Sequence, residues 1–218
     1  MYNITLLCTR HKEWGKCNSI ELYKIIESIR PDVIFEELSL YWHMNYYDYN
    51  AGNSLETNAI KEYQYQNNNT AKQVAVDTYA QSTYDGTFMD IVFETQMDES
   101  RKLRELVDNQ RKMEWEYGFN CLNSSQNDDL IEELHSLKEK ILGKIGDEKL
   151  QQDYRNWKDI QDKRENKMLQ NIYTYSKENP YHQGLFWVGS AHRKPIMQKI
   201  QEIEKTSAIK LNWNFYNS

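Results

Sequence analysis

The residues best suited to acid–base or ligand chemistry are two histidines, His11 and His192, that each follow a short apolar run. The run 4–8 leads to the first histidine and the run 185–188 leads to the second, with an arginine beside each histidine. Short apolar runs bounded by turn-forming residues are typical of buried strands, and open α/β sheets bind ligands just beyond the ends of their strands. We therefore expect one site built from both ends of the chain.

Carboxylates are expected at the same edge of the sheet. Glu36 and Glu37 end a second predicted strand, 32–38, and Asp77 ends a third, 71–77. Histidines and carboxylates together can hold a divalent metal ion and leave one coordination position for water. They can also act without a metal, with histidine as the general base and a carboxylate as its orienting partner. The residue types leave both kinds of chemistry open.

Arg10 and Arg193, beside the two histidines, would suit an anionic substrate group or a negative charge that develops on oxygen during a reaction. The sequence contains no Gly-rich phosphate-binding loop, no G-x-S-x-G motif and no H-E-x-x-H motif. We interpret the remaining histidines, His43, His135 and His182, as structural or surface residues.

The spacing of apolar residues predicts the elements that would position these side chains. A helix should begin near Asn18 or Ser19 and stop at Pro31, which completes a strand–helix–strand unit with parallel strands. The alternating segment 209–215 indicates a final edge strand. We therefore predict an α/β fold, in which a mostly parallel central sheet is flanked by helices and a long helical insertion precedes the last core strands.

Residues from about 41 to 70 differ from this core in being rich in Tyr, Asn and Gln. Their poor periodicity and many turn formers indicate a loop or broken helices. We consider two roles for the segment, a surface insertion with half-buried tyrosines and a lid or aromatic wall over the site.

A helical arm is expected from about 97 to 179. Its predicted helices run from about 89 to 120, from a cap at Asp128 or Asp129 to about 143, and from a cap at Asp147 to about 179. Alternating charges are dense along the arm, which is typical of a solvated surface. A contact between subunits, giving a homo-oligomer, is the alternative.

Composition restricts the class of protein. With 218 residues and 39% hydrophobic content the chain can bury one core, so we predict a single domain over 1–218. The net charge of −6 argues against binding nucleic acid by phosphate neutralisation. Three cysteines without a C-x-x-C pair fit a reducing compartment. Because there is neither a basic leader nor an apolar run of about 20 residues, we expect a cytoplasmic protein with no membrane contact.

Four short motifs give the sequence a resemblance to a known family. In chain order they are Thr9 with His11, the strand 31–38, Arg164-Glu165-Asn166-Lys167-Met168, and Gly189-Ser190-Ala191-His192. Together they resemble the TraB/Tiki-like family within the wider erythromycin-esterase/ChaN-like superfamily. The first, second and last match motifs of that family's βα core, and the third is similar to a helix of its esterase and ChaN-type members.

The resemblance implies that Glu37 is the family carboxylate, with Glu36 as an extra, and that Arg164 and Glu165 face the site. Cys8 stands where the family usually has glycine. Tiki-like members are described as metal-dependent proteases, erythromycin esterases as metal-independent ester hydrolases, and ChaN-like members as haem-binding proteins. The resemblance therefore implies a fold but leaves the chemistry open.

Our first hypothesis is a hydrolase of peptide or ester bonds in a small-molecule or peptide substrate, with metal-activated water favoured over a histidine base. In the metal-dependent version His11, Glu37 and His192 hold a divalent ion (Mn, Co, Zn or Fe), and Glu36 or Glu165 acts as the base.

The predicted substrate-binding residues are Arg10, Arg164, Arg193 and Asp77. Three alternatives remain open at this point. One is a metal-independent esterase with histidine as general base. The second is a non-catalytic module that binds a small molecule or, as the less favoured ligand, haem. The third, suggested by Cys8 in place of the family glycine, is a degenerate member of the family whose surface binds a protein partner.

Overall fold

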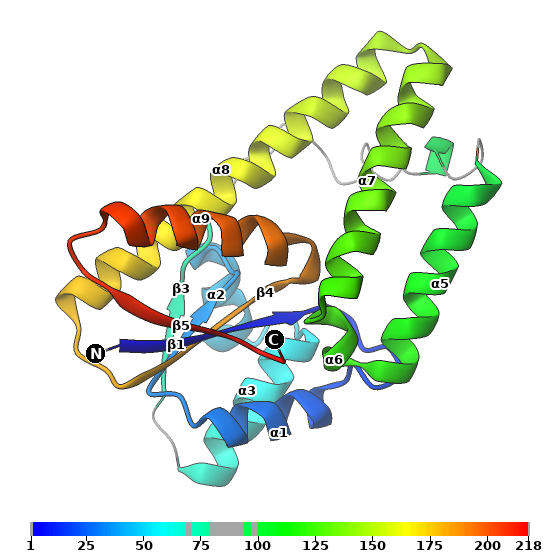
Figure 1. Cartoon of the computed structure of the whole chain (residues 1–218). Helices are drawn as coiled ribbons and strands as arrows, with labels where there is room; N and C mark the ends of the chain where they lie inside the picture. The colour runs from blue at the N-terminus through cyan, green and yellow to red at the C-terminus, as the bar shows by residue number, and fades with distance from the viewer. Residues whose placement is uncertain (1, 69–70, 79–93, 97–99, 218) are drawn as a thin grey trace.

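The apolar runs of the sequence form one parallel sheet at the centre of the molecule (Figure 1). The computed structural model describes residues 2–68, 71–78, 94–96 and 100–217. Within these residues the sheet has the strand order β3-β2-β4-β1-β5, and every neighbouring pair is parallel. The strands are β1 (Tyr2–Thr9), β2 (Val33–Glu36), β3 (Lys72–Ala75), β4 (Gln183–Gly189) and β5 (Leu211–Phe215). The predicted α/β fold with a parallel central sheet is confirmed.

Burial on both faces of the sheet explains the apolar runs. β1, β2 and β4 have neighbours on both sides, and consecutive residues such as Leu6 and Leu7 are both buried. A strand covered on both faces needs apolar side chains pointing both ways, so its sequence does not alternate. The outer strand β5 does alternate, with Leu211 buried and Asn212 exposed, as predicted for an edge strand.

Helices cover both faces of the sheet (Figure 1). α1 (Ser19–Ile29) packs with α3 (Leu55–Asn67) on one face, and α8 (Glu148–Glu178) packs with α9 (Arg193–Thr206) on the other. The Asn18 side chain caps α1 by accepting a hydrogen bond from the Glu21 backbone, as predicted. A short 3₁₀ turn, η1 (Ser190–His192), joins β4 to α9.

The Tyr/Asn-rich segment forms two helices, α2 (Leu40–Tyr47) and α3, so the expected broken helices are present. α3 is not a surface insertion, however, because Leu55, Ala59, Ile60 and Tyr63 are all buried. These residues recur at helical spacing, and the Tyr, Gln and Asn residues between them hide the pattern in the sequence. The expectation of a surface insertion is therefore wrong for α3, which is part of the core.

The strand order creates a crevice between β1 and β4. The connection that follows β1 runs through α1 on one face of the sheet, whereas the connection that follows β4 runs through α9 on the opposite face. Adjacent strands whose connections lie on opposite faces leave an opening at their carboxyl ends, where doubly wound sheets bind ligands. Thr9 and Gly189 are paired at this edge, so the segments that carry His11 and His192 emerge next to each other.

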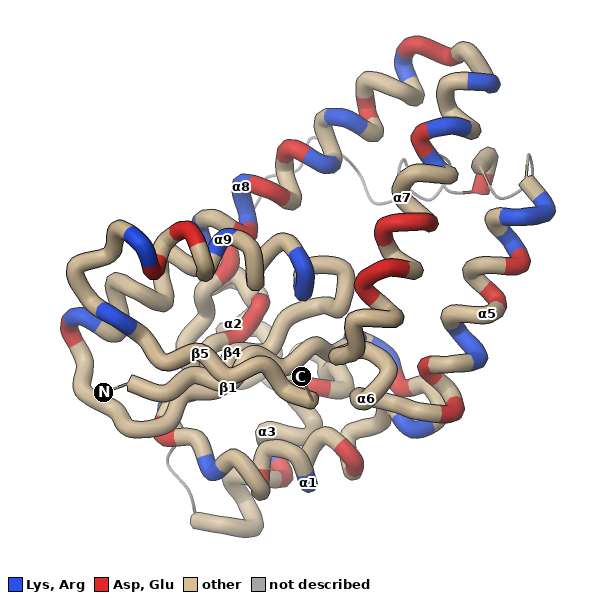
Figure 2. Tube along the Cα trace, viewed as in Figure 1, with Lys and Arg blue, Asp and Glu red and all other residues tan. Residues whose placement is uncertain are grey.

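The helical arm consists of α5 (Arg101–Tyr117), α6 (Phe119–Leu122), α7 (Ser125–Ile145) and the outer half of α8 (Figure 1). Basic and acidic residues alternate along it (Figure 2). α8 has 31 residues, or about 45 Å at 1.5 Å per residue, so one helix reaches from the arm to the sheet. No helix in the described ranges is long and apolar enough to cross a membrane.

The ends of the arm helices agree only in part with the predictions. Asp147 caps α8 as predicted, by accepting from the backbone of Lys149. α7 is capped by the Ser124 side chain, not by Asp128 or Asp129, so that prediction is wrong. The helix starts one turn earlier because Ser124 takes the cap position, which leaves Asp128 in the first turn. The predicted helix from about 89 to 120 is seen as α5, and 89–93 and 97–99 lie outside the described residues.

One buried side chain ties the arm to the sheet. β5 pairs with β1 only as far as Leu6. Beyond Leu6 the side chain of Asn123 makes the hydrogen bonds to β1 that a neighbouring strand would otherwise make. The Cys8 backbone N–H donates to Asn123 Oδ1 (2.7 Å), and Asn123 Nδ2 donates to the Cys8 carbonyl (3.0 Å). Cys8 itself is fully buried in the core, so it does not reach the ligand crevice.

Replacing Asn123 with alanine should lower the free energy of unfolding by about 2 kcal/mol, because two buried backbone groups of Cys8 lose their partner. Urea denaturation followed by circular dichroism measures the loss. Asn120→Ala, at an exposed position in α6, the short helix directly before Asn123, is the matched control. Equal midpoints for the two variants would contradict this role of Asn123.

Candidate functional site

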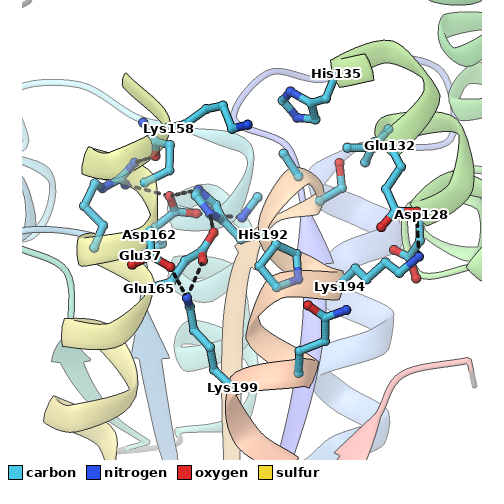
Figure 3. A pocket seen from close by; sticks show the side chains of 18 of the residues that line it. Glu37, Asp128, Glu132, His135, Lys158, Asp162, Glu165, His192, Lys194 and Lys199 are labelled. Carbon is cyan, nitrogen blue, oxygen red and sulfur yellow. Dashed lines mark hydrogen bonds and ion pairs between the residues drawn. The ribbon is translucent and has the colours of Figure 1, made fainter. Parts of the chain in front are cut away.

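A cleft of about 990 Å³ opens at the carboxyl edge of β1 and β4, between α7, α8 and α9 (Figure 3). Its lining includes His11, Glu37, Arg164, Glu165 and His192. These residues come from four different parts of the chain: the segments that follow β1, β2 and β4, and helix α8. The structure thus brings together His11, Glu37 and His192, as predicted from the strand ends, whereas the predicted Glu36 and Asp77 are not among the residues that line the cleft.

His192 lies at the bottom of the cleft between two carboxylates (Figure 3). Its Nδ1 is 2.7 Å from Glu165 Oε1 and its Nε2 is 3.3 Å from Glu37 Oε1. Burial alone would lower the pKa of His192, but the hydrogen bonds to Glu165 and Glu37 raise it to about 9. The imidazole is therefore protonated at neutral pH, with each N–H directed at a carboxylate.

Glu37 is held in place by three donors. The Gly189 backbone N–H donates to Oε2 (2.6 Å), Arg164 Nη2 donates to Oε1 (2.7 Å), and His192 is the third. Burial would raise the pKa of the Glu37 carboxyl, but the bond from His192 and the charges of His192 and Arg164 lower it to about 2. Glu37 thus stays ionised at any pH at which the protein would act.

The ion pairs continue on either side of Glu37 and His192. Arg164 also donates to Asp77, from Nη2 at 2.7 Å and from Nε at 3.1 Å, so Asp77 reaches the site only through this arginine. At the other end Lys199 pairs with Asp162 and lies 3.5 Å from Glu165 Oε2 (Figure 3). Acidic and basic groups therefore alternate across the floor of the cleft, which fixes each side chain.

His11 belongs to a separate pair that faces the same cleft. Its side chain is 63% exposed, and its Nδ1 lies 3.5 Å from Oε1 of Glu56, which is fully buried. The Thr9 hydroxyl donates to the same carboxylate oxygen at 2.8 Å. The pKa of His11 is raised, chiefly by its bond to Glu56. A buried carboxylate thus orients a solvent-accessible imidazole, whose Nε2 is left for a ligand or water.

The two arginines next to the histidines are engaged elsewhere. Arg10 lines the cleft but pairs with Glu114 of α5 at 2.5 Å. Arg193 is buried and pairs with Asp128 of α7. Although the sequences around His11 and His192 are similar, the two arginines therefore lie in different surroundings. Arg193 joins the arm to α9 and, contrary to the prediction, does not face a substrate.

Glu36, although next to Glu37 in sequence, lies on the opposite face of the sheet. It is fully buried, and the Tyr47 hydroxyl of α2 donates to its Oε2 at 2.8 Å. Burial, only partly offset by this bond, raises the pKa of Glu36 to about 8. Consecutive strand residues point to opposite faces, so the pair cannot act together in the cleft.

The predicted metal ligands His11, Glu37 and His192 do not form a coordination set. Among the described residues no group of three or more His, Cys, Asp or Glu side chains is placed to hold a metal ion. His192 directs both nitrogens at carboxylates, and His11 directs Nδ1 at Glu56.

Several residues of the site had no signal in the sequence. Glu56 lies in the Tyr/Asn-rich segment, where nothing distinguishes it from other acidic residues. Lys199 follows His192 on α9 and is recognisable only once α8 brings Asp162 and Glu165 against it. His135, interpreted from sequence as structural, lines the cleft from α7.

Comparison of the chain with family models, with curated proteins and with solved structures finds no significant match. The geometry and electrostatics of the cleft are therefore the basis on which a function can be proposed. The resemblance to the TraB/Tiki-like family stays a prediction.

Proposed function

We propose that the protein is a hydrolase of ester-type bonds in small molecules and that it works without a metal ion, with His11 as its general base. The observation that supports this most directly is the pairing of exposed His11, which lines the cleft, with buried Glu56. A carboxylate on Nδ1 fixes the ring and the tautomer, so that Nε2 can accept a proton from water. The ester-hydrolase branch of the superfamily that the sequence resembles uses the same kind of chemistry.

His192 has the complementary role of general acid. Its pKa of about 9 keeps it protonated at neutral pH, and Glu165 holds the ring through Nδ1. Water loses a proton to His11 as its oxygen attacks the carbonyl carbon. His192 Nε2, whose 3.3 Å contact with Glu37 is the longer of the two carboxylate contacts of the ring, then gives up its proton to the leaving alkoxide instead, as the carbon–oxygen bond breaks. One proton is taken and one is given, so the products are the acid and the alcohol. The two histidines then exchange protons with solvent.

The pH dependence of kcat/KM should be bell-shaped. His11 must be neutral, and because its pKa is raised above 6.5, activity should rise with pH through a value above 6.5. His192 must be protonated, so activity should fall as pH rises through about 9. Glu56→Gln should move the acidic limb to lower pH, since Glu56 is the main cause of the raised pKa of His11. An unchanged acidic limb in this variant would contradict the assignment of His11.

A chelator tests the metal-independent mechanism. Protein purified with and without EDTA is assayed against a panel of neutral esters by proton release, with the metal content measured in parallel. We expect equal turnover in both preparations. Turnover that EDTA abolishes and that one of Mn, Co, Zn or Fe restores would instead support the metal-dependent hydrolase.

A binding module without catalysis is the second candidate. It is favoured by the fact that both nitrogens of His192 already bond to carboxylates, an arrangement that stabilises a fold equally well. Saturable ligand binding with no hydrolysis anywhere between pH 6 and pH 10 would support this candidate over the hydrolase. A Soret band in the purified protein would identify haem as the ligand.

A further inference from the structure

Three aromatic rings from the arm meet beside the cleft. His135 of α7 and Trp157 of α8 both line it, and His135 points towards it in Figure 3. The centroids of these two rings are 5.9 Å apart, and Trp157 stacks on Tyr154 at 5.6 Å with 26° between the planes. His135 Nδ1 also lies 2.9 Å from the hydroxyl of Tyr154, which is 2% exposed. Contacts with this buried tyrosine therefore hold both cleft-lining rings in fixed orientations.

The charges around these rings are compensated. Lys158 pairs with Glu139 at 2.5 Å, and Lys194 pairs with Glu132 at 2.8 Å. Burial and the charges of Lys138 and Lys158 lower the pKa of His135, so its ring is neutral at pH 7. The arm side of the cleft thus offers flat, neutral surfaces, whereas the sheet side carries the ionised groups around His192.

We propose that His135 and Trp157 form a subsite that binds a neutral, planar aromatic group. If the proposed hydrolase function is correct, the substrates are esters that carry an aromatic ring. The ring would then lie against the arm while the ester bond lies at His11 and His192. Binding of the ring itself does not require that hydrolysis occurs.

The geometry favours an aromatic group over a saturated group of the same size. Both would gain from burial of apolar surface. Only a planar ring also gains from offset stacking on the indole and imidazole, which is worth a further factor of roughly 2 to 10 in affinity. Because the two protein rings are already held in place, binding costs little additional side-chain entropy.

Two neutral probes of similar size, 2-naphthol and decahydro-2-naphthol, test the proposal by isothermal titration calorimetry on the full chain at pH 7. The wild type should bind 2-naphthol about 5-fold more tightly than its saturated analogue. Trp157→Ala should weaken 2-naphthol binding about 10-fold, and Trp157→Phe, which keeps a ring, should stay within about 3-fold of wild type. Equal affinities of the wild type for the two probes would overturn the proposal, and that comparison needs no variant.

Trp42 provides a matched control. It stacks on Tyr46 at 5.8 Å with 27° between the planes, nearly the geometry of Trp157 on Tyr154, but it is not among the residues that line the cleft. Trp42→Ala should leave the affinity for 2-naphthol unchanged. Equal losses in the Trp42 and Trp157 variants would show non-specific adsorption to surface aromatics and would also overturn the proposal.

The His11→Ala variant separates this subsite from the hydrolase function. It should bind 2-naphthol as the wild type does while losing hydrolysis of 2-naphthyl acetate. Wild-type turnover with no preference for 2-naphthol would contradict the subsite alone. Normal 2-naphthol binding with no turnover of any ester by the wild type would support the subsite and contradict the hydrolase function.

Discussion

His11→Ala is expected to lower kcat/KM for ester hydrolysis about 10³-fold, because removal of a positioned general base typically costs between about 10²- and 10⁴-fold. The structure gives the reason, since His11 is the exposed imidazole of the cleft and Glu56 fixes its Nδ1. Steady-state kinetics at the pH optimum measures the loss. The fold should be unaffected because the side chain is mostly exposed.

His182→Ala is the control for this experiment. His182 is exposed, and the hydrogen bonds that it makes to the described residues come from its backbone: its N–H donates to Asp32, and its carbonyl accepts from Asn3. Its activity should match that of the wild type. Near-normal turnover in His11→Ala would refute the base assignment, and loss in both variants would indicate a change in the protein as a whole.

Glu37→Gln is expected to reduce the free energy of unfolding by roughly 3 kcal/mol at neutral pH. The pKa of Glu37 falls from 4.5 to about 2 on folding, and each unit corresponds to about 1.4 kcal/mol. A carboxyl whose pKa is lowered by folding stabilises the protein above its unfolded value. The contribution of Glu37 is therefore complete above pH 4.5 and is lost as the pH falls towards 2.

The contribution of His192 to stability depends on pH in the opposite direction to that of Glu37, because the pKa of His192 rises from 6.5 to about 9 on folding. Its contribution is complete below pH 6.5 and is lost as the pH rises through 9. Urea denaturation of the wild type should thus show a stability maximum between pH 4.5 and 6.5. Glu37→Gln should lower that maximum and flatten its acidic side.

Glu139→Gln is the matched control for Glu37→Gln. Glu139 pairs with Lys158 on the arm, but both side chains are about half exposed, so the pair is worth at most about 1 kcal/mol. If the two variants were equally stable, the buried ion pairs of the cleft would contribute no more than a surface pair. That result would contradict the electrostatic description of the site.

The position of the site could be predicted from the sequence because it depends on strand ends. Apolar runs in front of His11 and His192 indicate buried strands, and parallel strands bring their carboxyl ends to one edge of a sheet. Glu37, the end of the second strand, follows by the same reasoning. These inferences needed only local patterns and one rule of topology.

The partners of these residues could not be predicted, because they depend on packing between distant segments. No local pattern distinguishes Glu36 from Glu37, yet the side chain of Glu36, the last residue of β2, bonds to Tyr47, whereas that of Glu37, the residue after β2, bonds to Gly189 in the cleft. Arg193 resembles Arg10 in sequence, but α7 supplies Asp128 to bury it. The sequence likewise predicts a metal site from His and Glu residues at strand ends, but it cannot show how the side chains are placed relative to one another. In the structure both nitrogens of His192 face carboxylates, and no three such side chains among the described residues are placed around one ion.

The position of β4 has a consequence for how this chain acquires its structure. β1 and β2 lie near the start of the sequence, but they are not neighbours in the sheet, because β4 lies between them and pairs with both. During synthesis β1 and β2 therefore stay unpaired with each other, and the central sheet cannot assemble until residues 183–189, near the end of the chain, have been made. Contacts between such distant segments slow folding and leave apolar strand edges exposed in the meantime. We expect the nascent chain to depend on chaperones until β4 has left the ribosome, and chains truncated before β4 to aggregate.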